Sequence, residues 1–294
     1  MGAHTTIEWT DVSKSPWEGC TKVSAGCAHC YAARRDRWIH GGVHWGKGAP
    51  RRLVKSFPEE MVRLDAKAAL GVRMRVFPSI CDWLDEEVPV EWLASFLTVV
   101  AECECLDWQL LTKRPEVWRA RLEAVRDHFW RLGYPDVTTL MQMHDWVCAW
   151  LEGQPPEHVW VGVSVEDEAN RGRLEAASKI PATVCFASLE PLLGPVRLTE
   201  KELAGLDWVI VGGESGPGAR PCDVQWIEWI VEDCRRASVP VFVKQVGTHA
   251  VVDGRRLKVT GKGGDMREWP PGIQVRQVWP EWYVGSAFDL EGRR

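Results

Sequence analysis

The sequence has no apolar run long enough to span a bilayer. Its first nine residues carry neither the basic nor the apolar region of a secretory signal peptide. It also has no internal repeat and no low-complexity tract, and its glycine-rich stretch lacks both a Walker lysine and a complete G-x-G-x-x-G before a helix. We therefore expect a cytoplasmic globular protein with no membrane partner, and neither a P-loop nor a dinucleotide-binding fold is supported.

The length and composition of the chain fit a globular protein with a sizeable hydrophobic core. The 294 residues are 45% hydrophobic and 26% charged, which suits one large domain or two ordinary ones. Ten cysteines in a cytoplasmic protein are expected to be metal ligands, small buried residues or catalytic groups rather than disulfides.

The charge is unevenly distributed. The net charge is −5, yet residues 34–75 hold eleven Lys and Arg against four acids, which gives +7 there and −12 elsewhere. A basic segment on an acidic protein is typical of nucleic-acid binding, and a solvated helical face would explain it equally well. Trp38 and Trp45 lie inside this segment and could stack on bases, although most of the 18 tryptophans should pack in the core.

Three cysteines near the N-terminus form the pattern C-x6-C-x2-C: Cys20, Cys27 and Cys30. Three thiolates at this spacing can hold three irons of a [4Fe-4S] cluster, which leaves the fourth iron open to another ligand. The alternative is a structural zinc site, which needs a fourth ligand that a nearby histidine could supply: His29, His40 or His44.

Short apolar runs alternate with amphipathic segments of helical length. The runs cover residues 75–80, 107–111, 158–163, 183–187, 207–211 and 239–243, with residues 5–9 as a less regular first strand. Helical patterns cover residues 90–102, 115–132 and 223–237. This alternation predicts an α/β fold, a full or partial (β/α) barrel of six or seven parallel strands, with a doubly wound open sheet as the alternative.

We expect the barrel to span residues 1–250, with a helical insertion near residues 134–156. Residues 251–294 would form a C-terminal extension that contains a glycine-rich mobile loop.

Polar side chains follow nearly every expected strand. They are Asp82, Lys113, Arg114, Ser164, Glu166, Glu190, Glu214 and Lys244. The carboxyl ends of parallel strands meet at one rim of a barrel, which is where active sites of such folds are built. Some of these residues could instead cap the following helix, as Ser164 could. The glycines of Gly212–Ser215 would let backbone N–H groups approach a ligand closely, and Glu214 could accept hydrogen bonds from an amine or a ribose hydroxyl.

Seven segments together resemble the phage Gp37/Gp68 family, a DUF5131-like family with a three-cysteine motif found in phages and bacteria. They are Ile7–Asp11, Gly19–Ser24, Gly26–Ala32, Leu111–Pro115, Val161–Glu166, Glu190–Pro195 and Asp207–Gly216. This family in turn is similar to an outlying branch of the radical S-adenosylmethionine (SAM) enzymes, although their usual spacing is C-x3-C-x2-C and the first gap here has six residues.

The resemblance implies a barrel of the radical SAM type whose cluster is held by Cys20, Cys27 and Cys30. The open iron would bind the amine and carboxylate of SAM, and reduction would give a 5′-deoxyadenosyl radical. The implied cofactor-binding residues are His29, Tyr31, Asp82, Ser164, Glu166, Glu190, Gly212, Gly213, Glu214 and Ser215. The implied catalytic residues are Cys81, Lys113, Arg114 and Lys244, and either Cys81 or Cys185 could donate a hydrogen atom, as in the spore photoproduct lyase branch.

For partners, the resemblance implies an electron donor such as flavodoxin or ferredoxin, and a partner protein is conceivable. The substrate we expect is a nucleic-acid base, most simply of DNA in repair or modification, in the host cytoplasm if a phage encodes the protein. The alternative is a non-catalytic, zinc- or cluster-stabilised nucleic-acid-binding phage accessory protein.

Overall fold

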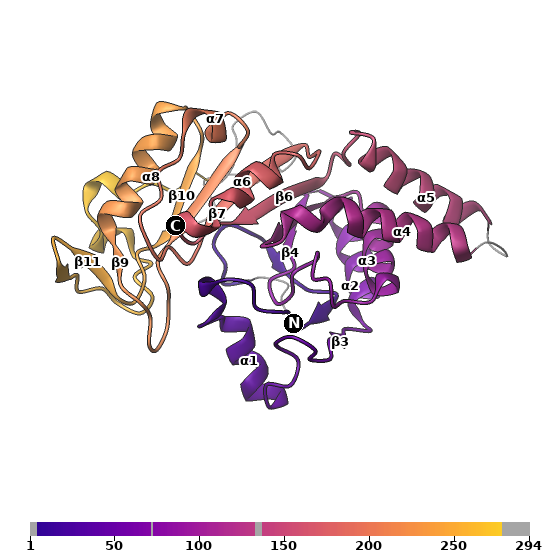
Figure 1. The fold of residues 1–294 in the computed structure, drawn as a ribbon, viewed down its shortest axis with the longest axis horizontal. Helices are drawn as coiled ribbons and strands as arrows, with labels where there is room; N and C mark the ends of the chain where they lie inside the picture. Colours follow the sequence, from indigo (N-terminus) through magenta and orange to yellow (C-terminus); the bar gives the residue numbers. More distant parts are fainter. Residues whose placement is uncertain (1–4, 72, 133–136, 278–294) are drawn as a thin grey trace.

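A computed structural model describes residues 5–71, 73–132 and 137–277 of the chain. Its centre is a seven-stranded, wholly parallel sheet that curls into half a barrel (Figure 1). In spatial order the strands are β1 (Val12–Ser13), β4 (Met74–Phe77), β5 (Leu106–Thr112), β6 (Val159–Ser164), β7 (Val184–Leu189), β8 (Trp208–Gly212) and β10 (Val241–Gln245). The predicted partial (β/α) barrel is confirmed. The doubly wound alternative is wrong, because the strand order follows the chain without the reversal such a sheet requires.

The strands are apolar on both faces because both faces are covered. All six residues of β6 are buried, and its neighbours pair with it in register, Leu110 with Val161 and Val161 with Cys185. One face packs against helices, and the other carries a cluster of large side chains that includes Trp9, Phe186 and Trp208. Continuous apolar runs are therefore required here rather than alternating ones.

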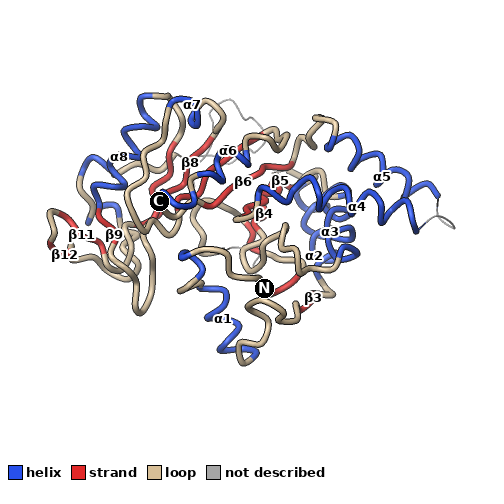
Figure 2. Tube along the Cα trace, in the orientation of Figure 1, coloured by secondary structure: helices blue, strands red, loops and turns tan. Residues whose placement is uncertain are grey.

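The helices lie around the strands and form the outer layer (Figure 2). They are α2 (Phe57–Ala68), α3 (Val90–Glu102), α4 (Trp118–Leu132), α5 (Val137–Leu151), α6 (Gly172–Ala177), α7 (Glu200–Leu203) and α8 (Val224–Arg236). The helix predicted over residues 90–102 has those bounds. The one predicted over 115–132 is divided into a short 3-10 helix, η2 (Pro115–Val117), and α4.

The predicted helical excursion after residue 133 is α5, which packs along α4 as a hairpin that projects from one end of the molecule (Figure 1). Residues 134–136, where the excursion was expected to begin, lie outside the described part of the chain.

The strand expected over residues 5–9 is wrong. These residues form a turn in which the Thr10 amide donates to the Ile7 carbonyl, and the first strand is β1, where Val12 pairs with Val76 of β4. The buried Asp11 accepts hydrogen bonds from the Arg75 guanidinium at 2.8 and 2.9 Å, which fixes β1 at the edge of the sheet. Trp9 still reaches the core, which explains why the segment looked like a buried strand.

Two smaller sheets complete the fold. β2 (Trp17–Glu18) pairs antiparallel with β3 (Arg52–Leu53), between which lie a short 3-10 helix, η1 (Ala25–Cys27), and α1 (Tyr31–His40). β9 (Cys222–Asp223), which precedes β10 in the chain, forms the other sheet with β11 (Ala250–Val252) and β12 (Arg255–Arg256), which follow it.

Three further 3-10 helices are η3 (Glu168–Asn170), η4 (Met266–Glu268) and η5 (Pro271–Ile273). Trp269 and Ile273 are buried against the cluster that contains the apolar face of α8. The division of the chain at residue 250 and the mobility of the loop that follows stay predictions. Within the described residues, no helix has both the length and the apolar character needed to cross a membrane.

Candidate functional site

A cavity of about 420 Å³ lies at the carboxyl ends of the parallel strands, beneath the loop that carries the three cysteines. Most of the side chains expected from sequence to form a site line this one cavity. They are Cys20, Cys27, His29, Cys30, Tyr31, Cys81, Asp82, Lys113, Arg114, Ser164, Glu190, Gly213, Glu214, Ser215 and Lys244. The strands place the polar residues there because β4 to β10 run in parallel and so end at a common rim.

Cys20 lies against a buried ion pair. Its sulfur is 3.6 and 3.7 Å from the two terminal nitrogens of Arg114, whose guanidinium donates to Asp82 at 2.7 Å. Burial raises the pKa of the Cys20 thiol well above its ordinary value, Asp82 raises it further, and Arg114 opposes them. A metal ion would replace the proton on this sulfur, and Arg114 would then balance part of the thiolate charge.

Cys27 and Cys30 are placed by local helix geometry. Cys27 ends η1, with its sulfur 3.7 Å from the Ser24 hydroxyl, and Cys30 occupies the N-cap position of α1. Burial raises the pKa of the Cys30 thiol, while the backbone N–H groups of Ala33 and Ala32 in the first turn of α1 lower it. The positive end of the helix therefore favours an anionic sulfur at this position.

Glu166 differs from its expected role because it does not line the cavity. It is fully buried behind the cysteine loop, where it accepts a hydrogen bond from the Ser24 hydroxyl at 2.8 Å and pairs with Lys113 and with Arg173. Burial would raise the pKa of Glu166, but Lys113, Arg173 and Ser24 outweigh it and the pKa is lowered. Gly26 fits over this carboxylate only because it has no side chain.

Glu214 holds the same loop from the other side. Its carboxylate accepts hydrogen bonds from His29 Nδ1 at 2.9 Å and from the Arg220 backbone and side chain, and Arg220 also donates to the Ala25 carbonyl at 2.9 Å. Burial would raise the pKa of Glu214, but the Arg220 hydrogen bonds outweigh it and the pKa falls to about 2. Glu166 and Glu214 thus position the loop, and Glu214 also lines the cavity. Their contact with a cofactor stays a prediction.

The Glu190–Lys244 pair is more open to a ligand. Lys244 Nζ is 3.1 Å from Glu190 Oε1, and Ser188 donates to the same carboxylate at 3.4 Å. The two charged side chains remain 14% and 21% exposed in the wall of the cavity. Gly212 does not line the cavity, but a Cβ there would lie 2.7 Å from Glu190 Oε1, so this glycine makes room for the pair.

The chain was compared with known proteins. Residues 4–271 match a family described as "Protein of unknown function (DUF5131)". The chain belongs to the DUF5131 family. No curated protein and no solved structure gave a match.

Of the two cysteines considered as hydrogen-atom donors, only Cys81 lies at the site. It lines the cavity close to Cys20, and burial raises its pKa well above the ordinary value. Cys185 lies near the amino end of β7, whereas the cavity lies at the carboxyl ends of the strands, and it does not line the cavity.

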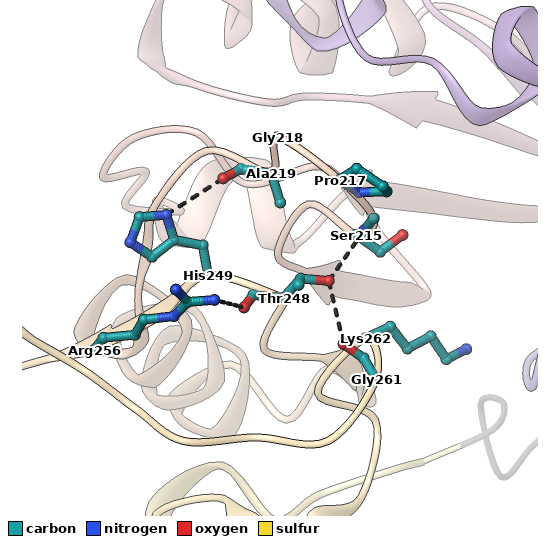
Figure 3. Close-up of a pocket in the computed structure, with 10 residues that line it drawn as sticks. Ser215, Pro217, Gly218, Ala219, Thr248, His249, Arg256, Gly261 and Lys262 are labelled. Carbon is teal, nitrogen blue, oxygen red and sulfur yellow. Dashed lines mark hydrogen bonds between the residues drawn. The ribbon is translucent and has the colours of Figure 1, made fainter.

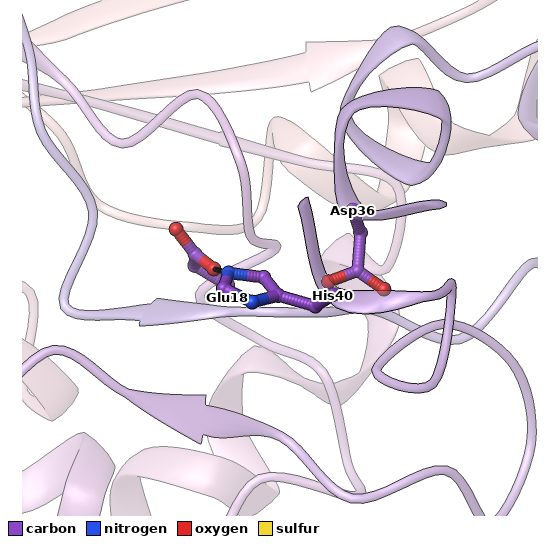
Figure 4. Close-up of side chains that lie close together, drawn as sticks. All are labelled: Glu18, Asp36 and His40. Carbon is purple, nitrogen blue, oxygen red and sulfur yellow. Dashed lines mark ion pairs between the residues drawn. The ribbon is translucent and has the colours of Figure 1, made fainter. Parts of the chain in front are cut away.

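Two of the three histidines considered as zinc ligands belong to an ion-pair network away from the cavity. His40 Nε2 is 3.1 Å from Glu18 (Figure 4), and His44 Nδ1 is 2.7 Å from Asp36. Glu18, Asp36 and His40 have three potential ligand atoms within 4.8 Å of one another. Because Glu18 also pairs with Arg35 and Arg52, two fixed cations already neutralise this cluster, which holds α1 against the strand that leads into Cys20.

The basic segment is largely neutralised in the fold. Arg75 pairs with Asp11, and Arg51, whose side chain is only 1% exposed, pairs with Asp85. Others also pair with acids, namely Arg35, Arg52, Arg63 and Arg73. Six of the eleven basic residues in the segment therefore pair with an acidic residue.

Of the aromatic residues that line the cavity, Tyr31 was expected at the cofactor and Trp45 was a candidate for stacking on a base, whereas Trp9 and Phe77 were not assigned to a site from sequence. Trp9, Trp45 and Phe77 line it together with Tyr31. The indole nitrogens of Trp9 and Trp45 are buried and have no hydrogen-bond partner among the described residues. They are donors that a ligand in the cavity could satisfy. Trp38, by contrast, is 86% exposed on α1.

Proposed function

We propose that the protein is a radical SAM enzyme that holds a [4Fe-4S] cluster through Cys20, Cys27 and Cys30 and acts on a nucleic-acid base. The observation that carries this proposal is that the three cysteines and the strand-end polar residues line one cavity. A structural metal site has no need for a cavity lined by an ion pair, serines and aromatic rings.

The residues present fit a cluster of this kind. Three thiols line the cavity, a guanidinium lies beside Cys20, and the start of α1 lies beside Cys30. The loop is held by two separate carboxylates, Glu166 and Glu214, which restrict where the sulfurs can go. When bound and reduced, the cluster supplies the electron that cleaves SAM.

The chain's own residues would bind and orient SAM and exclude water. The carboxylate of Glu190 suits an ammonium group and the ammonium of Lys244 suits a carboxylate, so this pair matches a zwitterion such as the methionine part of SAM. The aromatic side chains of Trp9, Trp45 and Phe77 offer faces and N–H donors to a planar ring.

A second function is favoured by one observation. Cys81 lines the same cavity as the three motif cysteines, so a fully ligated centre, zinc or iron–sulfur, would take Cys81 as its fourth ligand. Such a protein would be a metal-stabilised, non-catalytic nucleic-acid-binding protein without an open coordination position.

Metal content after anaerobic reconstitution with iron and sulfide separates the two. The radical SAM proposal predicts that Cys27→Ala abolishes iron–sulfur absorbance and that Cys81→Ala leaves it unchanged. Equal loss of metal in both variants would make Cys81 a ligand and would favour the second function. A matched control is Cys234→Ala, which changes a buried cysteine on α8 outside the cavity.

A further inference from the structure

A second depression adjoins the cavity, with which it shares Ser215 and Lys262. We call it the glycine groove; it has a volume of about 770 Å³ (Figure 3). It is formed by the loop after β8, the loop after β10, and β12 with the segment that follows it. Its lining residues are Ser215, Gly216, Pro217, Gly218, Ala219, Thr248, His249, Arg256, Gly261 and Lys262.

The side chains of the glycine groove favour an anion. Its ionisable lining residues are Arg256, Lys262 and His249, and none of its ten lining residues is an acid. Arg256 donates to the Thr248 carbonyl at 3.3 Å, and Lys262 is 3.1 Å from Glu8. The guanidinium of Arg34 adds positive charge beneath the loop, since a Cβ on Gly216 would lie 2.5 Å from it.

The backbone also offers donors. Among the described residues, no acceptor takes a hydrogen bond from the amides of Ser215 or Gly218. Gly216 and Gly218 have φ values of +94° and +75°, and no atom lies within 4 Å of where a Cβ on Gly218 would be. An oxygen-rich ligand can therefore approach this backbone closely.

The glycine groove continues into the cavity. Ser215 and Lys262 line both spaces, so a ligand in the groove can reach the cavity without crossing another element. The cavity itself has only about 420 Å³, which is the size of a site for one small molecule. A substrate larger than its reacting group must therefore extend outside the cavity, and the glycine groove is an adjoining space that could hold it.

We propose that the glycine groove binds the phosphate groups of a single-stranded polynucleotide whose base enters the cavity. This proposal rests on the proposed function in one respect: it takes a nucleic-acid base to be the group that reacts in the cavity. Phosphodiesters match the two cations and the free amides, and the groove is larger than one phosphate requires. A base can reach a buried cavity only when it is unstacked, which favours a single strand.

The test measures binding of a short fluorescein-labelled oligothymidylate by anisotropy at several salt concentrations. Arg256→Ala should weaken binding about fivefold and lower the slope of log affinity against log salt by about 0.7. Arg255→Ala is the matched control, because this exposed neighbour on β12 does not line the groove. Lys262→Ala and Lys258→Ala form a second such pair.

The measurement is repeated in the Cys27→Ala background, where no cluster forms, so that failure of the groove and failure of the proposed enzyme are distinguishable. Selective weakening by Arg256→Ala, together with no SAM cleavage by the reconstituted protein with Cys27 intact, would support the groove and reject the enzyme. Equal effects of Arg255→Ala and Arg256→Ala, or no binding, would overturn the groove. Thymidine monophosphate and inorganic phosphate are added as competitors at the same total phosphate concentration as the oligonucleotide. If either displaces the labelled oligonucleotide, the groove is a small-anion site and the proposal of a polynucleotide ligand is overturned.

Discussion

Gly26 is the position where one added methyl group should disturb the cysteine loop most directly. A Cβ at this residue would lie 2.4 Å from Glu166 Oε1, whereas ordinary contact begins at 3.4 Å, so the two groups would have to separate by about 1.0 Å. Glu166 cannot retreat, because its carboxylate is held by Ser24, Lys113 and Arg173 and the side chain is fully buried.

Overpacking of this kind costs about 1–3 kcal/mol. We therefore expect Gly26→Ala to lower the free energy of unfolding of the metal-free protein by about 2 kcal/mol in urea titrations. Cys27 follows directly in the chain, so displacement of the loop should also lower the iron bound per chain after reconstitution. Both quantities are measured on the same preparation.

Gly172→Ala is the matched control. Gly172 begins α6, no atom lies within 4 Å of its added Cβ, and the change should be neutral or stabilise the helix by up to about 1 kcal/mol. If Gly26→Ala has the same stability and iron content as Gly172→Ala, the cysteine loop does not dock on Glu166 and the account of its positioning is refuted.

Three other predictions concern charged residues. Glu166→Gln should lower the free energy of unfolding by about 3 kcal/mol and reduce the iron content. The control Glu175→Gln, at an exposed residue, should change the free energy of unfolding by less than about 0.5 kcal/mol in the same titration. Similar losses in both variants would show that the buried Glu166 carboxylate does not hold the cysteine loop. Hydrogen bonds from Arg171 lower the pKa of Glu202 from 4.5 to about 2, so the stability that Glu202→Gln removes should be largest above pH 4.5 and should vanish as the pH falls towards 2; a difference that stays constant from pH 6 to pH 2 would contradict this assignment. Lys244→Ala should weaken SAM binding to the reconstituted protein at least tenfold by calorimetry, and an unchanged Kd would remove Lys244 from the SAM site.

Much of the barrel follows from local patterns. The helix at 90–102 begins after Pro89 and has apolar residues at three-to-four spacing, and its predicted bounds are those of α3. Six apolar runs correspond to six strands of the sheet because each is buried on both faces. The edge strand β1 could not be predicted in this way, since it has only two residues and depends on Arg75 far along the chain.

Which rim residues hold the cysteine loop and which face the cavity could not be predicted from the sequence. Strand-end position indicates that Glu166 and Glu214 reach the rim, but not that they bind Ser24 and His29 of a loop more than 140 residues away. The excess of basic residues in segment 34–75 also does not by itself predict a basic surface. Arg51 and Arg75 form buried ion pairs with acidic residues, and these pairs cannot be recognised from the sequence. The basic groups against the glycine groove come from different parts of the chain: Arg34 belongs to the basic segment, whereas Arg256 and Lys262 follow β11.

The most direct measurement of the central claim is formation of 5′-deoxyadenosine. The protein is reconstituted anaerobically with iron and sulfide, mixed with SAM and a chemical reductant, and analysed for 5′-deoxyadenosine beside Cys27→Ala. The account predicts a brown protein with about four irons per chain that forms 5′-deoxyadenosine, and a variant that does neither. A colourless protein with one bound zinc, or a brown protein that leaves SAM intact, would contradict it.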